Sequence, residues 1–220
     1  DGCGALHTEL LRERVVREGA DLGIALDGDA DRTIMVDELG QEVDGDHMMA
    51  ILAIGLHKAG RLIEDTVVGT VMSNLGLELA LRQTDISLVR TPVGDRHVVE
   101  RMRQHGFNLG GEQSGHIVCL DHTTTGDGLI TALSVVTALL EAGRPLSELK
   151  SVVTKCPQSL LNVRVKEKRK LSEVPRVADA IRAAESALGD SGRVLVRYSG
   201  TEALARVMVE GQEAALVDAQ

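Results

Sequence analysis

The sequence predicts an α/β fold, in which layered α/β domains with mixed or parallel sheets precede a small C-terminal α+β domain. Up to about residue 156, short apolar runs alternate with segments of helical spacing, the pattern of helices that cover parallel strands. After Pro157 the order changes, because strands are grouped around a single helix. A domain boundary is therefore expected near 155–158, and an earlier one near 40–46.

The expected helices follow from apolar residues at intervals of three and four. Apolar side chains between Leu6 and Val15 share one helical face, which predicts a helix over 5–18. Asp46 and Ser73 are expected N-caps, since short polar side chains satisfy the free N–H groups at helix starts. Further helices are expected over 47–58, 74–83, 95–105, 129–140 and 173–188.

The expected strands are short runs of β-branched and other apolar residues. The run from Leu22 to Leu26 stops abruptly at Asp27, and the run from Leu160 to Val165 alternates like a strand. The glycine-rich stretch 110–115 is expected to form a loop. The remaining expected strands are 33–36, 67–72, 86–89, 116–120, 193–198 and 204–209.

Composition excludes some classes of partner. The formal net charge is -9 and there is no Trp, so the chain lacks the clustered cations and aromatic platforms of nucleic-acid-binding proteins. No apolar run approaches the roughly 20 residues of a membrane span, so neither nucleic acid nor a membrane is an expected partner. Cys3, Cys119 and Cys156 are far apart and odd in number, which favours a reducing cytoplasm. The first residue is not Met, and we expect a fragment of a longer protein.

Three carboxylates alternate in the loop that follows the first expected strand. Asp27, Asp29 and Asp31 can direct their oxygens at one hard cation, and Gly28 lets the backbone turn sharply. An EF-hand loop is excluded, because Arg32 stands where that loop requires glycine and because the flanks are strand-like. A solvated acidic turn is the simpler alternative, since aspartates are common in turns.

A glycine-flanked loop carries Glu112, Ser114 and His116, whose different hydrogen-bonding capacities suit the vicinal hydroxyls of a sugar. A tight turn with a satisfied histidine explains this loop equally well. Two weaker candidates precede expected helices, 91–97 with an Arg and a His, and 123–128 with three threonines. For both, an ordinary helix start is at least as good an interpretation.

The last candidate loop is Arg197-Tyr198-Ser199-Gly200-Thr201-Glu202, with Arg206 further along the chain. Hydroxyl and backbone N–H groups in such a turn form an anion-binding nest, and arginine adds charge-assisted, bidentate hydrogen bonds. A plain hairpin turn would not need the flanking arginines. The sequence therefore favours a phosphate site here.

Together and in this order, the loops resemble the α-D-phosphohexomutase family. Its metal loop DGDxDR, sugar loop GExSGH and phosphate loop RxSGTE stand intact at 27–32, at Glu112–His116 and at 197–202. Several further stretches are most similar to the members that act on glucosamine phosphates: Cys3-Gly4, 20–25, 72–78, 93–96, 124–128 and 206–211.

The resemblance implies an enzyme that interconverts 6-phospho and 1-phospho sugars. A phosphoserine gives its phosphoryl group to the substrate, the bisphosphorylated intermediate reorients, and the other phosphate returns to the serine. One Mg²⁺ neutralises charge during transfer. By this resemblance the metal ligands are Asp27, Asp29 and Asp31, and the catalytic residues are Arg32, which supports the phosphoserine, and His116, a proton-transfer partner. The implied substrate-binding residues are Glu112, Ser114, His116, Arg197, Ser199, Gly200, Thr201 and Arg206.

The resemblance also implies a division into domains and a substrate, and the chain departs from the family pattern in two places. Residues 1–42 would end a metal-loop α/β domain, 43–156 would form a sugar-binding α/β domain, and 157–220 a phosphate-binding α+β domain. The implied substrate is a phosphorylated hexosamine, converted between glucosamine 6-phosphate and glucosamine 1-phosphate. A homodimer is one assembly that the sequence leaves open. The Ser-His-Asn-Pro-like nucleophile segment is absent from the chain, and Ala203 replaces a usual proline. The chain alone is therefore expected to be inactive.

Two alternatives stay open. A phosphomannomutase or phosphoglucomutase would carry the same three loops, because Glu112, Ser114 and His116 are common to the family. A non-catalytic sugar-phosphate-binding module would explain the absent nucleophile, although the loops keep their functional side chains.

Overall fold

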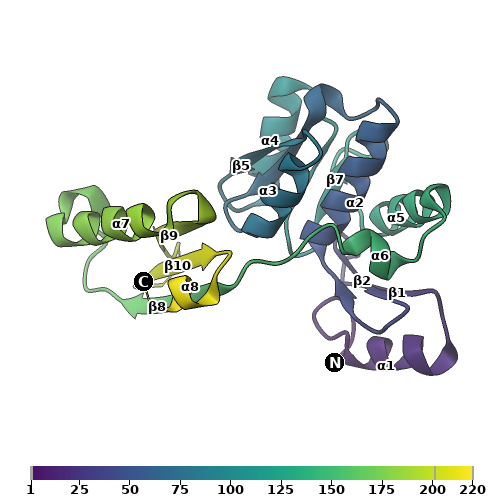
Figure 1. Cartoon of the computed structure of the whole chain (residues 1–220), viewed down its shortest axis with the longest axis horizontal. Helices are drawn as coiled ribbons and strands as arrows, with labels where there is room; N and C mark the ends of the chain where they lie inside the picture. The colour runs from purple at the N-terminus through teal and green to yellow at the C-terminus, as the bar shows by residue number, and fades with distance from the viewer. Residues whose placement is uncertain (1, 201, 220) are drawn as a thin grey trace. The chain divides into compact units, whose positions relative to one another are not determined.

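The computed structural model describes residues 2–200 and 202–219. The chain divides into two compact units, 1–154 and 155–220 (Figure 1). The predicted fold class is confirmed, since the larger unit combines mixed sheets with covering helices and the smaller unit is α+β.

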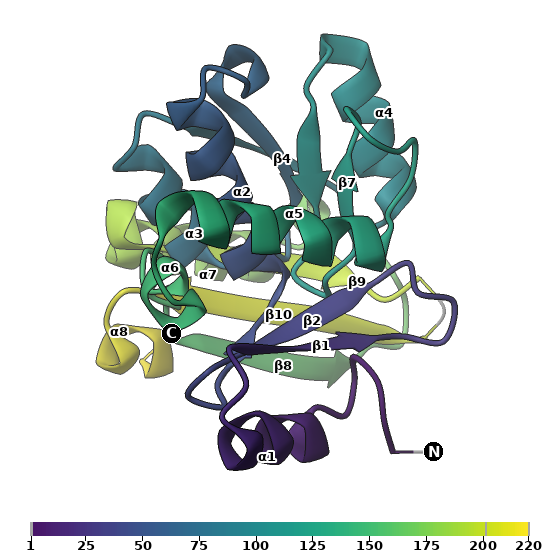
Figure 2. The ribbon, with the colours of Figure 1, turned by 90° about the vertical axis from the view of Figure 1, so that its right-hand side faces the viewer.

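The first unit begins with a helix and an antiparallel sheet of order β1-β2-β3. The helix α1 contacts one side of β1 and β2, and the later helix α5 (Gly128–Ala142) contacts both strands as well (Figure 2). We expected parallel strands here, and that prediction is wrong. The short link between β1 and β2 permits only a hairpin, in which Leu26 pairs with Thr33. These elements are α1 (Glu9–Glu18), β1 (Leu22–Leu26), β2 (Thr33–Asp37) and β3 (Glu42–Val43).

The second sheet of this unit has the order β5-β4-β6-β7. β4 pairs in parallel with β5 and β6, whereas β7 runs antiparallel to β6. The first two residues of the glycine-rich stretch that we expected as a loop, Gly110 and Gly111, belong to β6, because glycine lets this strand pack closely against Val68 and Met102; the rest of the stretch is a loop. The strands are β4 (Thr66–Thr70), β5 (Ser87–Thr91), β6 (Leu109–Gly111) and β7 (Ile117–Cys119).

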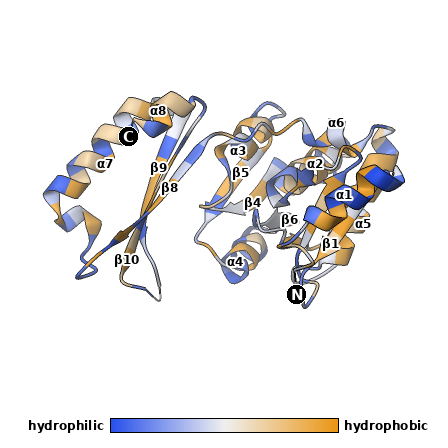
Figure 3. Ribbon diagram, turned by 90° about the horizontal axis from the view of Figure 1, so that it is seen from below, coloured by the Kyte–Doolittle hydropathy of each residue, from blue (hydrophilic) through white to orange (hydrophobic). Residues whose placement is uncertain are grey.

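Helices cover both faces of this sheet and define its two cores. Val67 of β4 packs into the larger core with α2, α3 and α5, while Val68 packs with Val98 and Met102 of α4. Figure 3 colours each residue by hydropathy. Helix α2, with its first half buried, is more hydrophobic than α1, in which only Val15 is buried. The helices are α2 (Gly45–Lys58), α3 (Leu75–Arg82), α4 (Asp95–His105), α5 (Gly128–Ala142) and α6 (Leu146–Lys150), with a 3₁₀ turn at Ile63–Asp65.

Two predicted helix caps are wrong by one or two residues. Asp44, not Asp46, caps α2 by accepting a hydrogen bond from the His47 N–H. Asp46 is buried and instead accepts from the Asn74 N–H at 2.9 Å. Asn74, rather than Ser73, then caps α3.

The short helix α6 is tied to the β2–β3 hairpin by a buried ion pair. Lys150 Nζ lies 2.7 Å from the Asp37 carboxylate, which is completely buried. The other carboxylate oxygen of Asp37 accepts the N–H groups of Leu39 and Gln41. The ammonium therefore compensates a charge that water cannot reach.

The second unit is a three-stranded antiparallel sheet of order β8-β10-β9 with helices on one face. Leu188 of α7, Val217 of α8 and Val209 of β10 form its small core. Helix α8 and the 3₁₀ turns were not predicted, and α7 begins at Pro175 instead of 173. The elements are β8 (Gln158–Arg164), α7 (Pro175–Leu188), β9 (Gly192–Tyr198), β10 (Leu204–Gly211) and α8 (Ala214–Asp218), with 3₁₀ turns at Leu171–Glu173 and Gly189–Ser191.

Among the helices of the described residues, none has the length and apolar character that crossing a membrane requires.

The cysteines should differ sharply in reactivity. Burial, with the nearby charge of Asp121, raises the pKa of the Cys119 thiol to about 11, whereas Cys3 is exposed. At pH 8 only about one Cys119 in a thousand would be the nucleophilic thiolate. We expect a disulfide reagent to label Cys3 within minutes and Cys119 only in urea, as peptide mass spectrometry can measure. Equal labelling of both in the native protein would contradict the burial of Cys119.

Candidate functional site

The three aspartates occupy the hairpin loop between β1 and β2. One carboxylate oxygen from each of Asp27, Asp29 and Asp31 can be chosen so that all lie within 4.8 Å of one another. The left-handed backbone of Ala30, with φ of 60°, turns the loop so that alternate side chains converge. Strands on both sides of the loop exclude the EF-hand, which requires helices.

The donor set fits a hard divalent cation. Mg²⁺ prefers oxygen ligands and is usually held by a few carboxylates while keeping other positions open. Asp31 Oδ1 is buried and accepts no hydrogen bond from the described residues, so an acceptor is available there. Arg32 follows, with Nε 3.7 Å from both Asp27 and Asp31, and its guanidinium is partly exposed.

The sugar loop connects β6 to β7. Its Glu112 carboxylate accepts the Gly94 N–H at 3.0 Å, so the weaker candidate loop 91–97 contacts this loop directly. Ser114 is exposed, whereas His116 is only 3% exposed. The three side chains therefore do not form one open row: Ser114 faces solvent and His116 faces the protein.

The metal loop and the sugar loop meet at the first residue of β2. The Thr33 N–H donates to the Gly115 carbonyl at 3.1 Å, and His116 Nδ1 lies 3.1 Å from Asp31 Oδ2. Gly115 has φ of 91°, and a Cβ there would lie 2.0 Å from the Thr33 carbonyl oxygen. Only glycine permits this approach.

The loop 123–128 also reaches the metal loop. The Gly128 N–H donates to the Ala30 carbonyl at 2.9 Å, and Gly126 lies against the His116 ring. Asp127 caps α5 by accepting the Ile130 N–H, as the simpler interpretation of this loop predicted. Four loops that are far apart in sequence thus converge in the first unit.

The phosphate loop is the turn between β9 and β10 in the second unit. Arg197 and Arg206 are direct partners across these antiparallel strands. Like charges in this arrangement are unfavourable unless an anion is near. Arg206 Nε is buried and has no hydrogen-bond partner within 2–200 and 202–219, although its terminal nitrogen lies 3.3 Å from Glu202. Thr201, also predicted to bind phosphate, lies outside the described residues.

Ser199 shapes this turn, with Gly200 exposed beside it. The Ser199 N–H donates to the Leu204 carbonyl, and its hydroxyl accepts the Glu202 N–H at 3.3 Å. Sequence reasoning missed Lys168, whose ammonium donates to the Ser199 carbonyl at 2.6 Å. The only available signal was the charged stretch around it, which does not indicate which lysine folds back.

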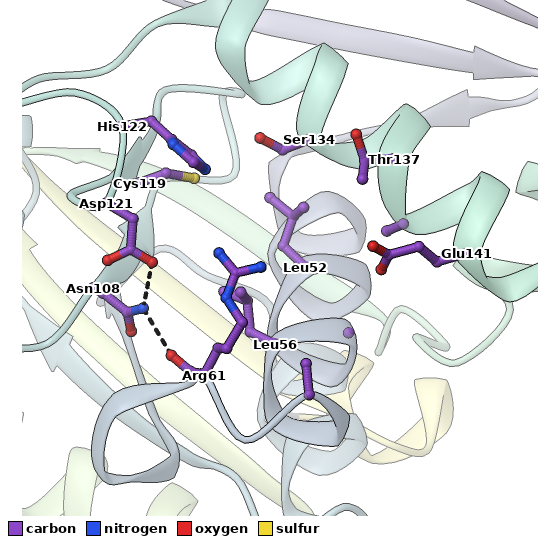
Figure 4. A pocket seen from close by; sticks show the side chains of 13 residues that line it. Leu52, Leu56, Arg61, Asn108, Cys119, Asp121, His122, Ser134, Thr137 and Glu141 are labelled. Atoms are coloured by element: carbon purple, nitrogen blue, oxygen red, sulfur yellow. Dashed lines mark hydrogen bonds between the residues drawn. The ribbon is translucent and has the colours of Figure 1, made fainter.

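A separate cavity with both apolar and charged lining residues lies between α2, α5 and the end of β7 and shares no residue with these loops. Figure 4 shows the Arg61 guanidinium directed into it, with Asp121, His122 and Glu141 around it. Asn108 fixes one wall by donating to Asp121 and to the Arg61 carbonyl. No sequence motif marked this cavity, because its residues come from distant segments.

Comparison with known proteins decides the family. Residues 44–156 match "Phosphoglucomutase/phosphomannomutase, alpha/beta/alpha domain III", and residues 160–220 match the C-terminal domain of the same family. The chain belongs to the phosphoglucomutase/phosphomannomutase family. The predicted resemblance to the phosphohexomutases is therefore confirmed.

Several curated proteins similar to this chain are phosphoglucosamine mutases. The chain is 55% identical over 214 residues to that of Syntrophotalea carbinolica, covering 97% of this chain and 47% of the relative. It is 55% identical over 213 residues to that of Myxococcus xanthus, covering 97% and 46%. The chain thus spans about half the length of the curated relatives it matches.

Solved structures of the family share the fold. A phosphoglucomutase/phosphomannomutase family protein of Burkholderia thailandensis superposes with a TM-score of 0.78 at 21% identity, covering 98% of this chain and 48% of that one. The N-acetylphosphoglucosamine mutase of Aspergillus fumigatus, in complex with GlcNAc-6P and magnesium, superposes with a TM-score of 0.77 at 23% identity, covering 100% and 55%.

Proposed function

We propose that this protein is a phosphoglucosamine mutase, which interconverts glucosamine 6-phosphate and glucosamine 1-phosphate through a phosphoserine and a bisphosphorylated intermediate. The product would serve the synthesis of UDP-N-acetylglucosamine. The observation that carries the proposal is the junction at Thr33, where the aspartate loop and the sugar loop are held together. The choice of amino sugar is supported by the 55% identity to phosphoglucosamine mutases.

In this proposal each loop binds a different group that takes part in the reaction. Asp27, Asp29 and Asp31 hold one Mg²⁺, which when bound offsets negative charge on the transferring phosphoryl group. Arg32, beside two of these carboxylates, adds positive charge where the phosphoserine approaches. Glu112 and Ser114 orient sugar hydroxyls by accepting and donating hydrogen bonds.

The turn of the second unit binds the phosphate that is not transferred. Arg197 and Arg206 supply charge-assisted hydrogen bonds, and Ser199, Gly200 and Thr201 supply hydroxyl and backbone donors. This assignment is supported by the facing arginines and by the buried Arg206 Nε.

We further propose that 1–42 ends the metal-loop domain, that 43–156 is the sugar-binding domain, and that 157–220 is the phosphate-binding domain. The family matches over 44–156 and 160–220 support this plan. A reducing cytoplasm is the proposed compartment, supported by three free cysteines. Because the 220 residues lack a Ser-His-Asn-Pro-like segment, the purified chain should bind substrate without turning it over.

The proposed substrate can be tested by calorimetric titration of the full chain with glucosamine, glucose and mannose 6-phosphates. We expect the amino sugar to bind tightest. Arg197→Ala should weaken its affinity about 10- to 100-fold, since hydrogen bonds to charged groups contribute about 1.5–3 kcal/mol. Arg176→Ala, at an exposed position of α7, is the matched control and should leave affinity unchanged.

The other outcomes separate the alternatives. A clear preference for the mannose or glucose phosphate would make the protein a phosphomannomutase or phosphoglucomutase. No binding of any of these phosphates by the folded chain would contradict the proposed substrate site. Turnover by the chain alone would contradict the expectation that these 220 residues lack the nucleophile.

A further inference from the structure

His116 lies between two elements of the proposed site and is turned away from solvent. Its side chain is 4% exposed, and Nδ1 lies 3.1 Å from Asp31 Oδ2. The only other ring nitrogen, Nε2, is buried and has no hydrogen-bond partner among the described residues. A group that exchanges protons with a sugar would need one nitrogen directed at the ligand.

The surroundings hold the ring in this orientation. A Cβ at Gly126 would lie 2.3 Å from Nε2, so the backbone of the loop 123–128 is packed directly against the imidazole. Hydrogen bonds from Thr33 to Gly115 and from Gly128 to Ala30 fix the loops on either side. The ring cannot leave Asp31 unless at least one of these loops moves.

The two oxygens of Asp31 differ in their contacts. Oδ2 faces the imidazole, whereas Oδ1 is buried without a hydrogen bond from the described residues, with Arg32 Nε 3.7 Å away. A carboxylate fixed through one oxygen presents the other in a defined direction. Partners that orient ligating groups in this way often change metal affinity 10- to 100-fold when removed.

We propose that His116 is a positioning residue of the metal loop. The Nδ1–H group donates to Asp31 Oδ2, and Oδ1 is thereby presented to the cation. This inference rests on the proposed function, because it takes the three aspartates as the metal ligands. It replaces the proton-transfer role that the family resemblance implies for His116 with an indirect one through Asp31.

The test compares two amide substitutions in the full chain, with Mn²⁺ binding followed by electron paramagnetic resonance. The amide nitrogen of His116→Asn is as many bonds from Cβ as Nδ1, and that of His116→Gln as many as Nε2. We expect His116→Gln to weaken Mn²⁺ binding about 10- to 100-fold. His116→Asn should stay within about threefold of the wild type, since it keeps the donor toward Asp31. Equal losses in both variants, or none in His116→Gln, would overturn the proposal.

A measurement on the unmodified protein guards against variants that do not fold. In ¹⁵N-labelled wild-type chain, the imidazole spectrum of His116 should show the proton on Nδ1, before and after Mg²⁺ is added. A proton on Nε2 alone would overturn the proposal.

Asp29→Asn separates this inference from the proposed function. Asp29 is exposed, so its substitution should remove a ligand without disturbing the fold. Suppose that the wild type and His116→Gln bind Mn²⁺ equally well and that Asp29→Asn fails to bind it. In that case only the positioning role is wrong. If the wild type fails to bind Mn²⁺, the metal site of the proposed function is wrong as well.

Discussion

Replacing Gly115 by alanine is expected to destabilise the first unit by about 3 kcal/mol or more, the range of severe backbone and packing defects. The new Cβ would lie 2.0 Å from the Thr33 carbonyl oxygen, and backbone on both sides leaves no flexible atom to yield. The hydrogen bond from the Thr33 N–H to the Gly115 carbonyl would then be lost. Urea unfolding followed by circular dichroism measures the free energy of unfolding.

Gly106→Ala is the matched control for this substitution. Gly106 has φ of 77°, close to the 91° of Gly115, but a Cβ there would meet nothing within 4 Å. Its substitution should cost only the left-handed backbone penalty of about 1–2 kcal/mol. Equal losses in the two variants would mean that the sugar loop and β2 are not in close contact. A larger loss in Gly115→Ala, with weakened Mn²⁺ binding, would support the junction of the two loops.

Lys150→Met is expected to destabilise the first unit by about 3–5 kcal/mol, the cost of breaking a buried ion pair by removing one partner. Asp37 is completely buried, and Lys150 Nζ is 2.7 Å from its carboxylate. Methionine fills a similar volume but leaves the Asp37 charge without a counterion. The free energy of unfolding from urea titration is again the measurement.

Two further variants show whether the buried charge causes the loss. Lys58→Met replaces an exposed lysine of α2 and should change stability by no more than about 0.5 kcal/mol. Lys150→Met combined with Asp37→Asn should be more stable than Lys150→Met alone, because the uncompensated charge is removed. Losses that simply add would show that the two residues do not interact.

Local patterns predicted most elements because they depend on neighbours in sequence. The helix over 95–105 begins and ends where expected, since apolar spacing and a following glycine mark it directly. The strand Leu22–Leu26 was predicted for the same kind of reason. The caps of α2 and α3 were misassigned because several polar residues stand at each helix start. Tertiary contact chooses among them, as the bond between Asp46 and the Asn74 N–H demonstrates.

Strand direction and the strand β6 could not be predicted from the same patterns. The alternation of strands and helices along the chain favoured parallel strands throughout, but it does not report the direction of any one pair, and β1 and β2 form an antiparallel hairpin. Glycines at Gly110 and Gly111 indicated a loop, yet they form a strand because they let neighbouring backbone and the Met102 side chain come close.

By itself, the sequence determined the fold class, the family and the chemical character of three loops, since motif residues keep their type wherever the chain places them. Only the tertiary structure decided which of these residues lie together. His116 was predicted as a substrate-binding and proton-transfer residue of the sugar loop. Its position beside Asp31 follows from the backbone hydrogen bond at Gly115 and from the packing of Gly126 against its ring. Lys168 likewise reaches the phosphate loop across 31 positions of sequence. Such contacts depend on the three-dimensional course of the backbone, which local spacing does not encode.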